Sequence, residues 1–416
     1  MSYIKKIKNE KFFILLILLV SISLLIGFHF NEDSTGGAYL DYSVHNQISE
    51  KFFNDFEKTL LEYDQLKSRH SPVVPIFFSF FKYLEFDEYL VRLFNLIIPF
   101  LIVYIFYKCL SLNFKKINSK ILILFSFLII LSPTIRSLSI WPDSHLFGLL
   151  FFVLTLYSFL IFLKSEKNKK IYYAIMNIIL LALCCYIRPS FVLFSIYFFW
   201  FFYKEYRFSK NLFFLFFLNI LLSLPAFYFL FIIDIMFLTI PAINEINLLT
   251  RINPSNKILI ISSIIFFHAI PFIYCKFSLI KEKFNNLNIY EHIFLILFIL
   301  INIFFFNYKL NFTGGGIFLH FSNIFNSNII FFLICYFSFI FIYIISMLDM
   351  KNFILLIIIF LSNPQLTIYH KYYDPIVLIT FFLLFNLNLD DELNKKKYIL
   401  FFYIHSLFFL LLSLVK

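Results

Sequence analysis

Long apolar runs alternate with short polar segments along almost the whole chain. The first run extends from Phe12 to about Phe30, and a helix needs roughly 20 such residues to cross a bilayer. Similar runs follow as far as the last one, 398–416. Pairing the runs between polar segments gives about thirteen spans. The pattern therefore predicts an all-α polytopic membrane protein.

The longest polar interruption is the segment 31–90. Within it, the apolar residues of 52–61 alternate with charged residues at helical spacing, which is typical of an amphipathic helix in the membrane interface. The apolar stretch 72–81 is short for a full span and predicts a second interfacial or re-entrant piece. We find no internal repeat, so the simplest expectation is a single membrane domain over 1–416.

Composition agrees with this pattern. Hydrophobic residues make up 61% of the chain, well above the roughly 45–50% apolar share of soluble domains. The formal net charge of +11 comes mainly from lysines in short segments such as 164–170 and 395–397. Cytoplasmic loops carry such an excess, so the charge indicates topology rather than nucleic-acid binding. The lysines before the first run place the N-terminus in the cytoplasm, and no signal-peptide cleavage site follows that run.

With this orientation, the ionisable side chains of the remaining loops face outward. They include Asp41, His45, Arg69, His70, Arg136, Asp143, Arg188, His370 and Lys371. A bacterial inner membrane, with the active site on its extracytoplasmic face, is the expected location. The five cysteines show no CxxC spacing, and no local ligand spacing joins His45, His70 or His320 to Asp41. The sequence therefore indicates no cofactor and no metal site.

Short motifs in the outward loops resemble a known enzyme family. Asp41, His45 and Gln47, then Tyr63-Asp64 and the Ser-Pro-x-x-Pro of 71–75, are similar to the first lumenal loop of the dolichyl-phosphate-glucose α-1,2-glucosyltransferases, and more broadly of the GT-C superfamily. Segments 137–144, 185–190 and 370–375 are similar to later family elements, in the same order. Departures are Tyr42, where the family usually has a second acid, and Lys371, near where an arginine is expected.

The resemblance implies a GT-C-like bundle in which Asp41 is the catalytic base. Arg188 ends an apolar run, where a cation should face a cavity or an anion, and the pair His370-Lys371 faces outward against the positive-inside trend. We therefore expect these three residues to bind the donor phosphate. The expected substrate-binding residues are His45, Arg69, His70, Asp143 and Tyr372.

Each assignment has a plainer alternative. Asp41 and Asp143 are also placed to cap the helices that follow them. Arg188 is also placed to snorkel to lipid headgroups, and Tyr372 to join an interfacial aromatic belt.

The function expected is transfer of a sugar from a polyprenyl-phosphate donor to an extracytoplasmic glycan, lipid or protein, with inversion and without nucleic acid. A lipid-linked oligosaccharide polymerase or ligase is a second reading, but its largest outward loop would be expected late in the chain. A transporter or flippase is a third. It would show ionisable residues near mid-span and an inverted repeat, whereas most charges here lie at span ends.

Overall fold

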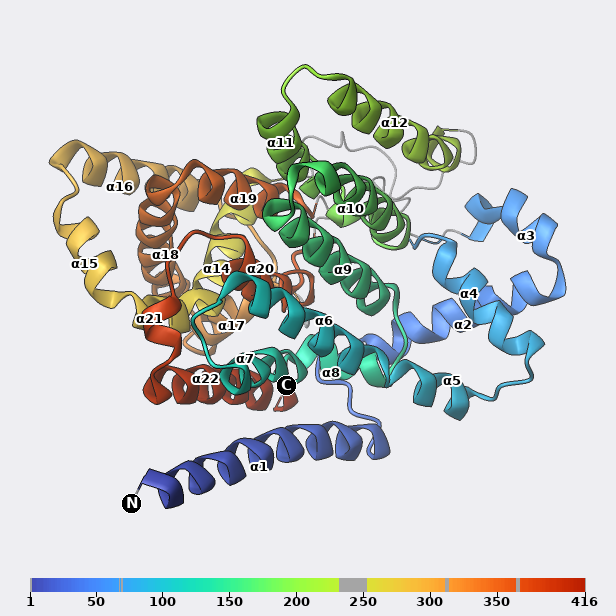
Figure 1. Ribbon diagram of the computed structural model, residues 1–416, viewed down its shortest axis with the longest axis horizontal. Coiled ribbons are helices and arrows are strands. Elements are labelled where there is room, and N and C mark those ends of the chain that lie inside the picture. Colours follow the sequence, from blue (N-terminus) through green and yellow to red (C-terminus); the bar gives the residue numbers. More distant parts are fainter. Residues whose placement is uncertain are drawn as a thin grey trace. The chain divides into compact units, whose positions relative to one another are not determined.

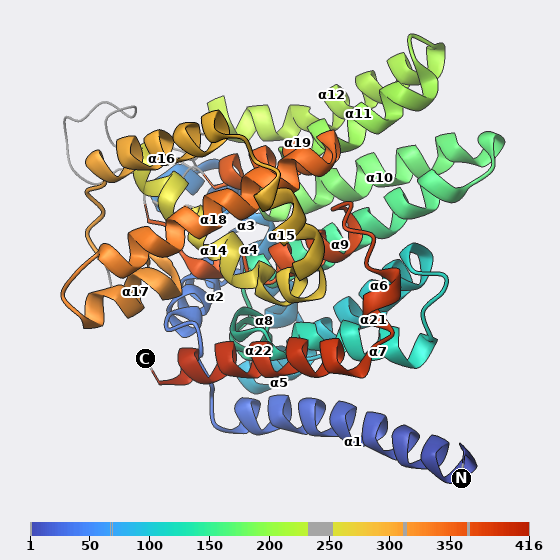
Figure 2. The same ribbon diagram turned by 90° about the vertical axis from the view of Figure 1, so that its left-hand side faces the viewer.

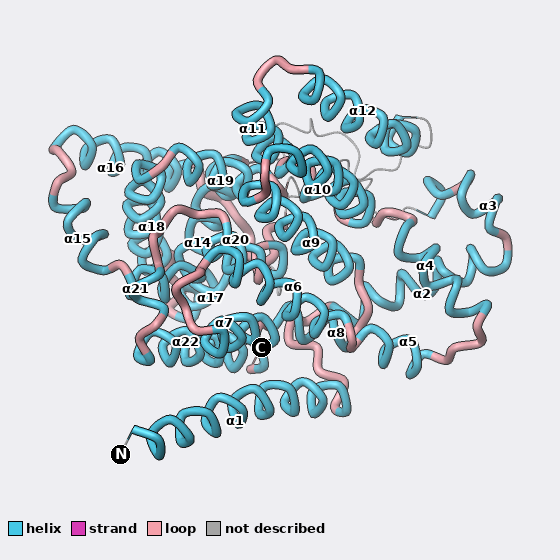
Figure 3. The backbone as a smooth tube through the Cα atoms, in the orientation of Figure 1, coloured by secondary structure: helices cyan, strands magenta, loops and turns pink. Residues whose placement is uncertain are grey.

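A computed structural model describes residues 2–66, 68, 70–231, 253–310, 314–363 and 367–415. Every regular element in these ranges is a helix, and the remaining segments are loops and turns, as Figure 3 shows. The chain divides into two compact units. The first comprises 1–241 with 402–416, and the second comprises 242–401.

The first unit contains α1 (Ser2–His29), α2 (Ala38–Asn54), α3 (Phe56–Leu61), η1 (Tyr63–Leu66), α4 (Val73–Tyr83), α5 (Glu88–Asn95), α6 (Ile98–Asn113), α7 (Ser119–Phe127), η2 (Leu128–Leu131), α8 (Pro133–Ile140), α9 (Ser144–Lys164), α10 (Lys167–Ile187), η3 (Pro189–Phe191), α11 (Phe194–Tyr206), α12 (Lys210–Phe231) and most of α22 (Lys396–Leu414). The second contains α14 (Pro254–Cys275), α15 (Phe277–Asn285), α16 (Ile289–Phe304), α17 (Gly316–Ile324), α18 (Ile329–Leu348), α19 (Met350–Leu361), η4 (His370–Tyr372), α20 (Ile376–Leu383) and α21 (Asp390–Leu393).

Among the described residues, 7 helices are long and apolar enough to cross a membrane, or up to 9 if each of two bent helix pairs forms one span. The chain is thus an all-helical, multi-pass membrane protein, as the pattern predicted. Other apolar helices, such as α4 and α19, are shorter than a bilayer requires. The count of about thirteen spans and the single domain stay predictions.

Helix α9 forms the centre of the first unit. It packs along α10 and α6, and both views show α9 beside α10 (Figure 1, Figure 2). Aromatic rings fill the neighbouring space: the ring of Phe152 lies 4.6 Å from those of Phe191 and Phe194. In the second unit, α14 is largely buried and packs against α18 and α17.

The segment 31–90 contains several short helices, and the amphipathic helix predicted over 52–61 is interrupted at Asp55, where α2 ends and α3 begins. The buried residues of α2 include Tyr42, His45, Ile48 and Phe52, which recur every three or four residues and so form one face. This face packs on α4. The position of these helices in the membrane interface stays a prediction. The packing of α2 on α4 holds the polar residues of α2 in a defined position within the first unit.

Candidate functional site

Asp33 holds the turn that starts α2. Its carboxylate accepts hydrogen bonds from the backbone N–H groups of Gly36, Gly37, Ala38 and Tyr39, at 3.0–3.3 Å. The Ser137 hydroxyl of α8 donates another at 2.9 Å. Burial opposes ionisation of Asp33, but these hydrogen bonds outweigh it and lower the pKa of the carboxyl. Asp33 therefore serves as the anchor of the loop.

Asp41 lies in the first turn of α2, whose N-cap is Gly37. The alternative that Asp41 caps this helix is therefore wrong. Its side chain is half-buried, while His45, four residues later on the same helix, is wholly buried at 0% exposure. Residues with this spacing are neighbours on a helix surface. The predicted base thus lies at the exposed edge of a buried polar cluster.

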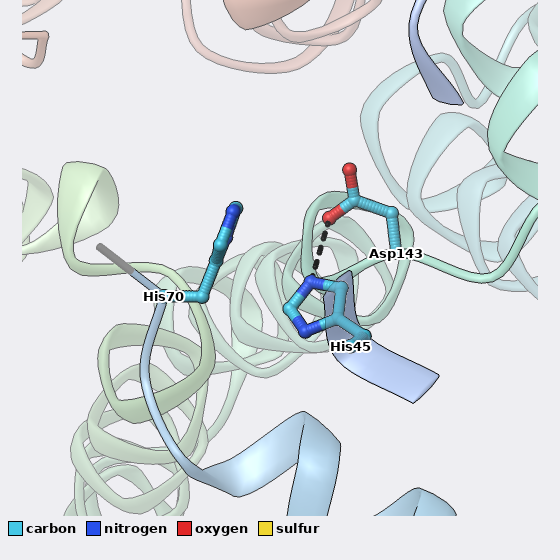
Figure 4. Close-up of side chains that lie close together, drawn as sticks. All are labelled: His45, His70 and Asp143. Atoms are coloured by element: carbon cyan, nitrogen blue, oxygen red, sulfur yellow. Dashed lines mark ion pairs between the residues drawn. The ribbon is translucent and has the colours of Figure 1, made fainter. Parts of the chain in front are cut away.

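That cluster joins three residues from distant parts of the chain. The Nε2 atom of His45 lies 3.7 Å from Oδ1 of Asp143, and the rings of His45 and His70 are 4.5 Å apart in an edge-to-face arrangement. Figure 4 shows the three side chains lying next to one another, His45 on α2, His70 on the loop before α4 and Asp143 before α9. Three predicted substrate-binding residues are therefore neighbours.

Asp143 also caps α9, so its capping alternative is confirmed. Its Oδ1 accepts hydrogen bonds from the backbone N–H of His145, at 3.0 Å, and from the hydroxyl of Ser144, at 2.8 Å. The side chain is only 2% exposed. Capping fixes the direction of the carboxylate, and capping does not prevent the group from contacting His45.

Two buried arginines contact the loop that follows α1. Arg136 donates from Nε to Glu32 Oε1 at 2.8 Å and from Nη1 to the Ser23 hydroxyl at 2.9 Å, so it is an ion-pair partner within the unit. Arg92 donates to Asn31 at 2.6 Å and to the Ile140 carbonyl at 3.0 Å. Both tie helices to the loop after α1.

Arg188 ends α10 beside the first turns of α9. A Cβ added to Gly148 of α9 would lie 2.8 Å from the Cβ of Arg188, so the two backbones approach closely here. The Arg188 side chain is half-buried. Gly148 lies one to two turns beyond Asp143. Arg188 therefore lies near the end of α9 that carries Asp143 and its neighbours His45 and His70.

The segment 370–375, which contains His370, Lys371 and Tyr372, lies in the second unit. His370 Nε2 lies 2.9 Å from Nε2 of His268, so one ring donates and the other accepts. The Nζ atom of Lys371 lies 5.8 Å from the centre of the Tyr369 ring, and the ring of Tyr372 packs edge-on against the same tyrosine at 5.4 Å.

The loop before α17 contacts the segment before η4, because the Gly315 N–H donates to the Ile368 carbonyl at 2.9 Å. Arg69, a predicted substrate-binding residue, lies outside the described residues.

No protein-family model, curated protein or solved structure matches this chain. The site is therefore interpreted from its own geometry.

Sequence reasoning gave no role to Glu32, Asp33, Arg92 or His268. A usable signal existed for His268, because an imidazole inside an apolar run is expensive unless it has a partner. No comparable signal separated Asp33 from Asp41, since both are acids in the same loop. Only the tertiary contacts distinguish their roles.

Proposed function

We propose that this chain is a membrane glycosyltransferase that transfers a sugar from a polyprenyl-phosphate donor to an extracytoplasmic glycan, lipid or protein. The observation that carries the proposal is the position of Asp41. It is a half-buried carboxylate four residues before the wholly buried His45 on the same helix, at the edge of a buried polar cluster. The proposal includes a GT-C-like bundle with its site on the outer face of a bacterial inner membrane.

In the proposed reaction, Asp41 removes the proton from an acceptor hydroxyl as its oxygen attacks the anomeric carbon. The bond between that carbon and the donor phosphate breaks, and its electron pair leaves with the polyprenyl phosphate. A single base opposite the leaving group gives inversion, whereas a covalent route needs a second carboxylate about 5 Å away as nucleophile. Arg188 compensates the charge of the leaving phosphate.

The roles of His370, Lys371 and Tyr372 remain predictions. These residues belong to the second unit, and His370 has a partner there in His268. The proposal accordingly rests on Asp41 and Arg188 of the first unit.

The test is sugar transfer by membranes that contain the full chain. Radiolabelled polyprenyl-phosphate glucose and polyprenyl-phosphate mannose serve as donors, with endogenous acceptors. We expect Asp41→Asn to lower transfer by about 100-fold or more, the usual contribution of a general base. Glu50→Gln is the matched control, because Glu50 is exposed on the same helix and its pair with Lys82 lies at the surface. Equal transfer by Asp41→Asn and the parent, at equal expression, would show that the base is misassigned.

A transporter is the second candidate, favoured by the helix pair 119–131 and 133–140, which bends by 67°. Broken helices line substrate sites in many transporters. The charge nearest this break, Arg136, is however neutralised by Glu32. Donor movement across proteoliposomes without sugar transfer would favour this candidate over the enzyme.

A further inference from the structure

The cluster of His45, His70 and Asp143 has the composition and compactness of a metal-ligand set. One ligand atom from each residue lies within 4.8 Å of the corresponding atoms of the other two. Two of the residues are buried, with His45 at 0% and Asp143 at 2% exposure, and His70 is half-buried. Three residues from separate segments are thus gathered in one place.

We infer that these three side chains bind a divalent transition-metal ion. Two imidazole nitrogens and one carboxylate oxygen are donors that suit Zn²⁺, Co²⁺, Fe²⁺ or Mn²⁺. Mg²⁺ and Ca²⁺ prefer sets made of oxygen alone. This site adds to the proposed sugar transfer and does not depend on it.

The state of His45 supports this inference. Its ring is fully buried, and neither ring nitrogen makes a hydrogen bond in the structure. A buried polar group without a hydrogen bond is destabilising, so such groups usually have a partner such as a water molecule or an ion. Its Nε2 faces Asp143, and a metal ion between the two would be bound by both.

The distances require only a small adjustment. Ligand atoms about 2.0–2.1 Å from a tetrahedral zinc ion are about 3.4 Å from one another. The 3.7 Å between His45 and Asp143 is close to this value. The backbone on either side of the His70 ring is held, because the carbonyl of His70 accepts from the Tyr63 hydroxyl at 2.9 Å and its N–H donates to Ser68 at 3.2 Å. Rotation of the His70 side chain is therefore the main movement needed.

The surroundings resemble those of an open metal site. The capping hydrogen bonds to Oδ1 of Asp143 orient this carboxylate, as outer-shell groups do for metal ligands. Three protein ligands leave at least one coordination position for an oxygen from water or from an anion. A closed structural zinc site would have four protein ligands.

Metal binding is tested on the purified full chain in detergent, after removal of metal with a chelator. Co²⁺ is titrated while absorption and tryptophan fluorescence are recorded. The chain has two tryptophans, and Trp141 lies two residues before Asp143, so the Trp200→Phe background reports on the site. We expect one Co²⁺ per chain with quenching of Trp141, and displacement of Co²⁺ by Zn²⁺.

Single ligand variants identify the site. His45→Gln, His70→Gln and Asp143→Asn should each weaken binding by at least the 10–100-fold that loss of an outer-shell partner costs. Asp143→Asn is the sharpest of these, because asparagine still caps α9 but carries no charge. His29→Gln, at an exposed position on α1, is the control and should bind as the parent does.

Two results would overturn the inference. One is the absence of Co²⁺ binding by the parent, and the other is equal binding by the parent and by Asp143→Asn with an unchanged melting temperature. If His45→Gln does not fold, His70→Gln and Asp143→Asn carry the test. Because every readout is metal binding, failure here leaves the sugar-transfer proposal standing, and loss of transfer by Asp41→Asn does not decide this one.

Discussion

Three acids near the end of α1 have three different environments. Glu32 is paired with Arg136, Asp33 accepts backbone hydrogen bonds, and Asp41 lies half-buried on α2. A carboxylate that already accepts several hydrogen bonds is stabilised in its charged form and is a poor base. Glu32 and Asp33 are therefore poor candidates for the base, and the assignment of Asp41 stays a proposal.

Removal of the Asp33 carboxylate should destabilise the first unit. Asp33→Ala removes the carboxylate that accepts from the N–H groups of Gly37, Ala38 and Tyr39, and we expect a loss of about 2 kcal/mol in the free energy of unfolding, as for other caps. Thermal unfolding of the purified chain measures it. Asp64→Ala, at an exposed residue of η1, is the control and should change little.

The pKa of Asp33 also predicts a pH dependence. Because the pKa is lower in the folded chain than its ordinary value of 3.8, this carboxylate stabilises the fold above that value. Its contribution is lost as the pH falls through the folded-state pKa. The melting temperature of Asp33→Asn should therefore fall less than that of the parent between neutral pH and pH values below 3.8. Parallel curves for the two proteins would contradict this role.

Breaking the buried pair of Glu32 and Arg136 should be costly. Arg136→Ala leaves the Glu32 carboxylate buried without its partner, which typically costs 3–5 kcal/mol, so we expect a large drop in melting temperature at about neutral pH. The double variant Glu32→Leu with Arg136→Met removes both charges and should recover much of the loss. A double variant no more stable than Arg136→Ala would argue against an isolated pair.

At the scale of helices, the contact between α9 and α10 depends on one glycine. A Cβ at Gly148 would lie 2.8 Å from the Cβ of Arg188, which cannot rotate away. Gly148→Ala should therefore separate the helices and cost about 1–3 kcal/mol, the usual cost of overpacking. If Arg188 binds the donor, transfer should fall as well. Leu183→Ala, at an exposed position on α10, is the control and should change the melting temperature little.

Helix positions also show how much the sequence pattern predicted. The stretch 52–61 is helical apart from a break at Asp55, and α4 occupies most of the apolar stretch 72–81, whose interfacial or re-entrant placement stays a prediction. The pattern did not reveal the bend after Leu131, where Pro133 starts α8. Hydrophobic periodicity reports which residues are buried, but a bend inside an apolar run leaves that periodicity nearly unchanged.

For the whole molecule, the predicted orientation is tested by cysteine labelling. Ser71→Cys should react with a membrane-impermeant maleimide in intact cells. Asn168 lies in a lysine-rich segment, which is typical of a cytoplasmic loop, so Asn168→Cys should react only after the membrane is opened. The five native cysteines give a low background, since four are buried and Cys185 is half-buried. Labelling of Asn168→Cys in intact cells would show that the orientation is the opposite of the predicted one.

The sequence by itself determined that the chain is helical, that it crosses a membrane several times, and that the long polar segment 31–90 contains helices. These properties follow from the local periodicity of apolar residues and from the cost of burying unpaired polar backbone groups in lipid. Both can be judged from the order of residues along the chain. The same reasoning named His45, His70 and Asp143 separately, each as a polar residue in an outward loop, and found no metal-ligand spacing among them.

Only the tertiary structure decided that these three side chains meet. The residues lie on three segments, and the packing of α2 on α4 together with the start of α9 brings them within 4.8 Å. Contacts between distant segments depend on how buried faces fit together, and that fit leaves no periodic trace in the sequence. The same kind of contact between distant segments brings the Ser137 hydroxyl of α8 to the Asp33 carboxylate, at 2.9 Å.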